Sequence, residues 1–116
     1  MRTWTRSESR EISDSYSLSL TVGPGNSEQV ELGMALISGR LYVRAFRGRG
    51  SQWYQAAIKA GLGTVAIGTV RVNVELTPTD GPSEEIEAAY LAKYGPRAAL
   101  VASPEARAAT LLIEPT

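Results

Sequence analysis

Three arginines lie within six positions of one another, directly before two adjacent aromatic residues. They are Arg44, Arg47 and Arg49 in the segment LYVRAFRGRGSQWYQAA, which covers residues 41–57. The planar guanidinium group of arginine binds phosphate and carboxylate groups through paired hydrogen bonds. Because these arginines cluster in a loop that also contains glycine, the segment predicts an anion-binding site.

The same segment predicts the elements that would hold such a site. Apolar and polar residues alternate over residues 41–44, which indicates a strand. Ser51 is a suitable N-cap for a helix that begins with Trp53 and Tyr54. At a strand–loop–helix junction, backbone N–H groups and the positive helix end face the same space as the loop. Ser51, Trp53 and Tyr54 therefore join the three arginines as candidate cofactor-binding or substrate-binding residues.

This loop also has a purely structural interpretation. Arg47 and Arg49 could be solvated, or could pair with carboxylates of a later helix, and exposed pairs of that kind contribute only about 0 to 1 kcal/mol. Trp53 and Tyr54 are adjacent, so they point in different directions on a helix. One of these two aromatic residues is therefore expected in the core.

The chain contains no histidine and no cysteine. These absences exclude a Ser-His-Asp triad, thiolate nucleophiles, disulfides and cysteine-ligated metals, and no metal site is predicted. Proton transfer is left to carboxylate, tyrosine, lysine or arginine groups, unless a bound molecule brings its own reactivity. Any catalysis is therefore expected to depend on a cofactor or on the substrate itself.

Composition narrows the class of protein further. The length of 116 residues fits one domain, and twelve basic residues balance twelve acidic ones. A net charge of zero lacks the field on which nucleic-acid and membrane binding largely depend. The N-terminus lacks the apolar core of a signal peptide, and no run of eighteen apolar residues is present. We therefore expect a cytoplasmic protein without nucleic-acid or membrane partners.

The pattern of the chain predicts a mainly β domain. Residues 1–15 are polar and lack periodicity, so a loosely ordered arm is expected there, in which Trp4 and Ile12 could pin a short helix to the body. Residues 16–116 are expected to form a single domain. Its strands are predicted at residues 16–22, 29–37, 41–46, 64–67, 69–76 and 110–114, and its helices at residues 51–60 and 84–94.

These elements predict a small antiparallel barrel with two short helices at its rim, because most strands are joined by hairpin connections. Gly61 falls where a left-handed residue would end the first helix. Tyr90 and Tyr94 share one face of the second helix, so both are expected in the core, with their hydroxyl groups hydrogen-bonded at the rim.

Four segments carry a family resemblance, namely LYVR, WY, AYLAKYG and SPEAR. They resemble a small bacterial family known only as a domain of unknown function, over residues 41–116. That family is similar to the split β-barrel proteins of the deazaflavin-dependent nitroreductase and flavin reductase group, where a strand leads through a loop into a WY-type helix start beside the cofactor phosphate. The resemblance implies a split β-barrel, FMN or deazaflavin as cofactor, a homodimer, and a phosphate-binding edge formed by Arg47, Arg49, Ser51, Trp53 and Tyr54.

One departure from that group concerns residues 22–33, VGPGNSEQVELG. The nitroreductases carry a Gly-Arg-Lys-Ser-Gly-like segment there that helps to hold the phosphate, whereas Glu28 and Glu31 would oppose it. Three functions therefore fit the sequence. They are an oxidoreductase-like protein that binds FMN or a deazaflavin, a cofactor-free cyclase or isomerase for an apolar small molecule, and a non-catalytic homodimeric binding module.

Overall fold

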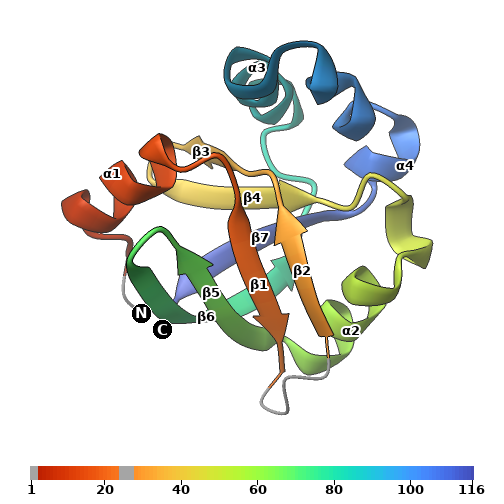
Figure 1. Cartoon of the computed structure of the whole chain (residues 1–116). Coiled ribbons are helices and arrows are strands. Elements are labelled where there is room, and N and C mark those ends of the chain that lie inside the picture. The colour runs from red at the N-terminus through yellow and green to blue at the C-terminus, as the bar shows by residue number, and fades with distance from the viewer. Residues whose placement is uncertain (1–2, 24–27) are drawn as a thin grey trace.

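The computed structural model describes residues 3–23 and 28–116 and contains seven strands and six helices there (Figure 1). The strands are β1 (Leu18–Val22), β2 (Glu28–Leu32), β3 (Ala35–Ile37), β4 (Arg40–Arg44), β5 (Leu62–Ile67), β6 (Val70–Pro78) and β7 (Thr110–Pro115). The helices are α1 (Arg6–Asp14), α2 (Gln52–Ala60), α3 (Ser83–Tyr94) and α4 (Pro104–Arg107), with the 3-10 helices η1 (Gly48–Gly50) and η2 (Gly95–Val101). The predicted mainly β fold is confirmed, with more helices than the two expected.

All strands belong to one antiparallel sheet in the order β2-β1-β5-β6-β7-β4-β3. β2 and β3 are its two edges, yet only Gly33 and Met34 separate them along the chain. The three steps from Leu32 to Ala35 span at most about 11 Å, so the sheet must curl until these strand ends are neighbours. The sheet is therefore the predicted small split barrel, with the helices at its rim.

The predicted strand over residues 29–37 is in fact two strands, β2 and β3. Leu32 and Met34 are both buried in the same core, so the alternation of side chains continues across the break and conceals it. A Cβ atom on Gly33 would lie 3.2 Å from the Tyr94 ring, so glycine permits the close approach of α3 at this point. The chain thus moves from one sheet edge to the other beneath a helix.

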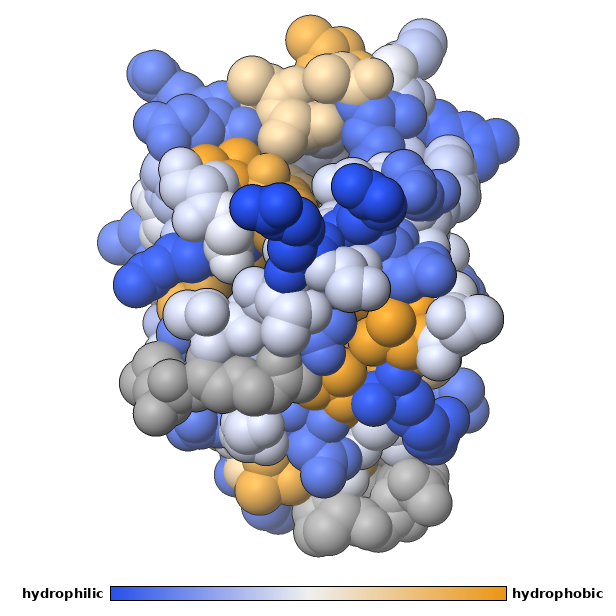
Figure 2. Space-filling model, turned by 90° about the vertical axis from the view of Figure 1, so that its left-hand side faces the viewer, coloured by the Kyte–Doolittle hydropathy of each residue, from blue (hydrophilic) through white to orange (hydrophobic). Residues whose placement is uncertain are grey.

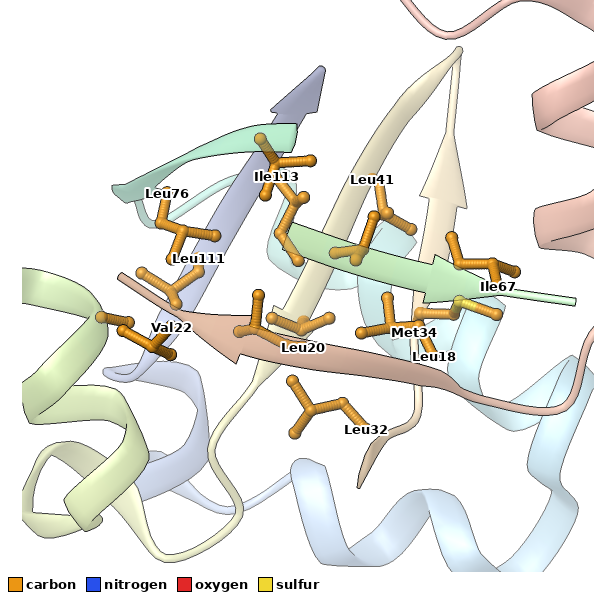
Figure 3. Packing of buried hydrophobic residues seen from close by; sticks show 14 of the residues in the cluster. Leu18, Leu20, Val22, Leu32, Met34, Leu41, Ile67, Leu76, Leu111 and Ile113 are labelled. Carbon is orange, nitrogen blue, oxygen red and sulfur yellow. The ribbon is translucent and has the colours of Figure 1, made fainter. Parts of the chain in front are cut away.

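Apolar side chains fill the inside of the curled sheet (Figure 3). Residues from five strands point toward one another there, among them Leu20, Leu41, Ile67, Leu76 and Leu111. A second apolar cluster lies under α3 and includes Ile86, Tyr90, Tyr42 and Leu112. Because β7 faces both clusters, four successive residues of it are buried, as in strands covered on both sides.

The N-terminal segment is more ordered than the loosely ordered arm that was expected. Thr5 and Glu8 form a reciprocal capping box at the start of α1. Ile12 is buried, and the Trp4 indole donates a hydrogen bond to the Ile113 carbonyl oxygen over 3.2 Å. The Lys93 ammonium group bonds the Ile12 carbonyl oxygen, where a cation stabilises a helix end. Local capping and a few long-range contacts therefore order α1.

The face that carries α1 is mainly hydrophilic in Figure 2, and its hydrophobic residues form small, separate patches.

The junction between β4 and α2, on the other side of the molecule, follows the sequence pattern closely. α2 begins after Ser51 and ends at Gly61, whose φ of 69° is the predicted left-handed conformation. Across the described ranges, no helix has the length and apolar character needed to cross a bilayer.

Candidate ligand-binding cleft

A cleft of about 750 Å³ opens at the rim of the barrel and is enclosed by three walls. The first wall is β2, the second is the junction between β4 and α2, and the third is the end of α3 with η2; these segments face one another at the right of Figure 1. Small-molecule sites typically occupy roughly 300–1,000 Å³. The lining residues are Tyr16, Gln29, Val30, Glu31, Leu32, Gly33, Arg44, Phe46, Arg47, Gly50, Ser51, Gln52, Trp53, Tyr90, Tyr94, Arg97, Leu100 and Val101.

The cleft brings together four of the six residues that the sequence nominated, namely Arg44, Arg47, Ser51 and Trp53. Tyr54 instead packs into the barrel core with 4% of its surface exposed, while the neighbouring Trp53 faces the cleft. One of the two aromatic residues is thus in the core, as the sequence indicated. The Arg49 side chain bonds the Ala108 carbonyl oxygen over 2.9 Å and does not line the cleft.

Arg44 lines the cleft, but its side chain is buried and its hydrogen-bonding capacity is used. The guanidinium group makes five hydrogen bonds to four other residues. These partners are the Thr110 hydroxyl, the Val101 carbonyl oxygen, the Glu87 carboxylate, and the hydroxyl and carbonyl oxygens of Ser83. Since arginine has five N–H donors, none is left for a ligand. Arg44 therefore ties β4 to β7, α3 and η2.

Glu87 extends this buried network toward the surface. Its carboxylate lies 2.6 Å from Arg107 and 3.3 Å from Arg44. Hydrogen bonds from Arg107 and Arg44 lower the pKa of Glu87, although partial burial opposes that shift. The carboxylate is therefore ionised at neutral pH and balances part of the charge of the two arginines.

Arg47 has a contrasting environment at the mouth of the cleft. It is exposed, its guanidinium carbon lies 5.6 Å from the centre of the Phe46 ring, and none of the described carboxylates pairs with it. The Ser51 hydroxyl donates to the Gly48 carbonyl oxygen over 2.8 Å and makes no capping bond to α2. Arg47 and the start of α2 therefore lie together at this wall, and the Ser51 side chain does not cap the helix.

The sequence did not indicate the η2 wall, and it indicated the β2 wall only through the family resemblance, as part of the segment 22–33 in which Glu28 and Glu31 would oppose a phosphate. Arg97 is exposed on η2, where it bonds the Tyr16 hydroxyl over 3.2 Å, and it also lacks a carboxylate partner among the residues described. Glu31 is exposed on β2 and accepts a hydrogen bond from Ser17. The Glu28 side chain lies outside the described part of the structure. No local motif marks these residues, because the curl of the sheet brings the walls together.

Aromatic residues concentrate in this cleft, which is lined by five of the eight in the chain: Tyr16, Phe46, Trp53, Tyr90 and Tyr94. The Tyr94 ring packs edge-on against Tyr16 and lies 5.6 Å from the Tyr90 ring, measured between ring centres. The prediction that Tyr90 and Tyr94 are core residues holds for Tyr90, while Tyr94 is only half-buried. Both rings also contribute to the cleft, which their shared helical face could have suggested.

The hydroxyl groups of these two tyrosines bond the backbone at the split between β2 and β3, as predicted for the rim. Tyr90 donates to the Gly33 carbonyl oxygen over 3.1 Å. Tyr94 donates to the Tyr16 carbonyl oxygen over 2.7 Å and accepts the Met34 N–H over 2.9 Å. Burial raises the pKa of both Tyr90 and Tyr94. At neutral pH both hydroxyls are protonated and hydrogen-bonded to the backbone. The two tyrosines therefore contribute their rings to the cleft, and not a free proton donor.

Metal coordination finds no support in the described ranges, where no three acidic side chains are grouped to hold an ion. The fold and the cleft together define the class: a small split-barrel protein with an aromatic cleft at its rim.

Within that class, the chain belongs to the bacterial family described as "Uncharacterized protein conserved in bacteria (DUF2255)", whose model matches residues 11–113. Among curated proteins, no sequence matches the chain.

Solved structures share the fold at low sequence identity. The conserved hypothetical protein Rv2991 from Mycobacterium tuberculosis has a TM-score of 0.62 and 12% identity, over all of this chain and 83% of that one. A NimC/NimA family protein from Clostridium acetobutylicum has a TM-score of 0.64 and 11% identity, over 98% of this chain and 85% of that one. At such identities the likeness establishes the barrel fold and no activity.

Proposed function

We propose that the protein binds a planar, negatively charged small molecule in the cleft, with FMN or a deazaflavin as the first candidate. One observation carries this proposal: the cleft of about 750 Å³ combines five aromatic residues with Arg47 and the start of α2. Flat rings bind on aromatic faces, and phosphate binds beside a guanidinium group at a helix start. A flavin-type cofactor has both parts.

The charges of the cleft favour one orientation of such a ligand. Arg47 and Arg97 lie on two walls, whereas Glu31 lies on the β2 wall. Glu31 would repel a phosphate group, so the phosphate is best accommodated at the junction wall, between Arg47 and α2. The ring system would then face Trp53 and Tyr94.

The residues of the chain would hold and orient the cofactor rather than transfer protons. The hydroxyl groups of Tyr90 and Tyr94 are committed to backbone atoms, and all donors of Arg44 are in use. A bound flavin supplies hydride or electron transfer itself. These features favour the oxidoreductase-like interpretation over acid–base catalysis by the cleft.

A cofactor-free cyclase or isomerase is the second candidate, favoured by the apolar part of the cleft wall at Val30 and Leu32. Such an enzyme would bind an apolar substrate and fix its shape. Side chains already fill the barrel interior, so the substrate would have to use the same cleft. A non-catalytic homodimeric binding module remains the third proposal.

Titration of the purified protein with FMN, riboflavin and a deazaflavin tests the first candidate. We expect FMN to bind with a Kd below about 100 μM, observed as a change in flavin fluorescence. Riboflavin carries the same ring system without the phosphate. Arg47→Ala should therefore weaken FMN about tenfold and leave riboflavin within about twofold. Arg71→Ala is the control, because Arg71 is exposed on β6 outside the cleft.

The outcomes separate the candidates. Equal loss of FMN and riboflavin in Arg47→Ala would assign Arg47 a structural role. Absence of binding by all three compounds at 100 μM would remove the flavin proposal. Binding of an uncharged apolar dye at the cleft in that case would favour the cofactor-free enzyme.

A further inference from the structure

β2 presents its hydrogen-bonding edge, and not only one face, to the cleft. It is the last strand on its side of the sheet and pairs with β1 alone among the described strands. Five consecutive residues, 29–33, line the cleft. Side chains alternate between the two faces of a strand, so an uninterrupted series of this kind means that the cleft runs along the strand edge.

Much of this edge has no partner in the described structure. At its far end, Tyr90 bonds the Gly33 carbonyl oxygen and Tyr94 bonds the Met34 N–H. For residues 29–32, the described backbone hydrogen bonds go only to β1. An open strand edge is a template for pairing with another extended chain.

The mouth of the cleft has the composition of a protein interface. Tyr16, Phe46 and Leu100 line it, and they are three of the six large apolar residues that are exposed, at 58%, 52% and 58% of their surface. Interfaces are enriched in aromatic residues and arginine, and both kinds of residue line this cleft. Exposed apolar residues gathered at one site mark a binding surface.

The charge at this surface indicates what kind of segment would bind. Arg47 and Arg97 stand on the walls beside the β2 edge, and neither has a carboxylate partner among the residues described. Acidic side chains of a bound segment would supply these partners. Glu31 projects from the edge strand itself, so the residue paired opposite it would be neutral or basic, as cross-strand pairing requires.

We propose that β2 binds an extended, acidic peptide segment of another protein as an eighth strand of the sheet. Backbone hydrogen bonds to residues 29–32 provide the affinity, and Arg47 with Arg97 select acidic side chains. The apolar residues of the peptide cover Phe46 and Leu100. This interaction goes beyond small-molecule binding and does not depend on it, although both ligands would use Arg47.

The test uses an unlabelled, capped peptide of alternating valine and glutamate, five residues long to match β2, and isothermal titration calorimetry with the whole chain. We expect saturable binding below about 1 mM. The same peptide with its alternate amides N-methylated keeps every side chain and charge but loses backbone donors. It should bind at least about tenfold more weakly. Arg97→Ala should weaken the unmethylated peptide several-fold, and Arg71→Ala should not.

Hydrogen exchange reports directly on pairing at the strand edge. Peptide binding should slow the exchange of the amides within residues 29–32 that point away from β1, and the N-methylated peptide should protect them less. Equal binding of the two peptides, unprotected β2 amides, or no binding at 1 mM would each overturn the proposal. A dimeric native mass with these amides already protected would overturn it too, because a second copy would then occupy the edge. FMN titration results do not bear on any of these outcomes.

Discussion

Arg44 and Arg47 are three positions apart in one short segment, yet they belong to two different regions of the molecule. Arg44 lies in a buried network, where five hydrogen bonds to residues of β7, α3 and η2 saturate its guanidinium group. Arg47 lies at the exposed mouth of the cleft beside the Phe46 ring, and no carboxylate among the described residues pairs with it. The comparison teaches that an arginine is available to a ligand only where the fold has not already supplied its acceptors.

Removing the buried arginine is the strongest test of the difference between Arg44 and Arg47. Arg44→Met should lower the free energy of unfolding by about 3–5 kcal/mol, because the substitution leaves buried acceptors and a carboxylate without their partner. Urea denaturation followed by circular dichroism measures this loss. Arg47→Ala, on an exposed side chain, should stay within about 0.5 kcal/mol of the wild type. Similar unfolding curves for the two variants would show that the buried network does not stabilise the fold.

The tyrosine hydrogen bonds at the split between β2 and β3 should have the next largest effect on stability. Tyr94→Phe removes the acceptor of the Met34 N–H and the donor to the Tyr16 carbonyl oxygen. Leaving partly buried backbone groups unsatisfied should cost about 1–3 kcal/mol of unfolding free energy. Tyr54→Phe is the matched control, since Tyr54 is buried but its hydroxyl has no partner among the described residues. Equal stability of both variants would mean that packing of α3, and not its hydroxyl groups, closes the split.

How well a feature could be predicted depends on how far apart in the sequence the residues that determine it lie. The alternating strands and α2 with its Gly61 cap depend on neighbouring residues, so the sequence predicts them well. The environment of Arg44 depends on Ser83, Val101 and Thr110, which lie 39, 57 and 66 positions away. Local patterns therefore located the junction wall of the cleft and the resemblance pointed to the β2 segment, while the η2 wall emerged only from the curl of the sheet.

Acid should weaken the link between the buried network and the surface. Because hydrogen bonds from Arg107 and Arg44 lower the pKa of Glu87 in the folded state, its stabilising effect is complete above the unfolded-state pKa of about 4.5. That effect is lost as the pH falls through the lower, folded-state pKa. At pH 7 the free energy of unfolding of the wild type should exceed that of Glu87→Gln by about 1 kcal/mol or less. This difference should vanish in acid. A pH-independent difference between their urea midpoints would contradict this assignment.

The smallest effect is expected for Arg49, which lies in the same loop as Arg47 and allows the two positions to be compared. Arg49 is exposed, bonds the Ala108 carbonyl oxygen and does not line the cleft. Arg49→Ala should therefore change stability by no more than about 0.5 kcal/mol and leave the Kd for FMN within about twofold. Arg47→Ala, two positions earlier, should weaken FMN about tenfold while leaving stability equally unchanged. If both variants lose FMN affinity alike, the loop acts through its total charge, and the wall position of Arg47 has no special role.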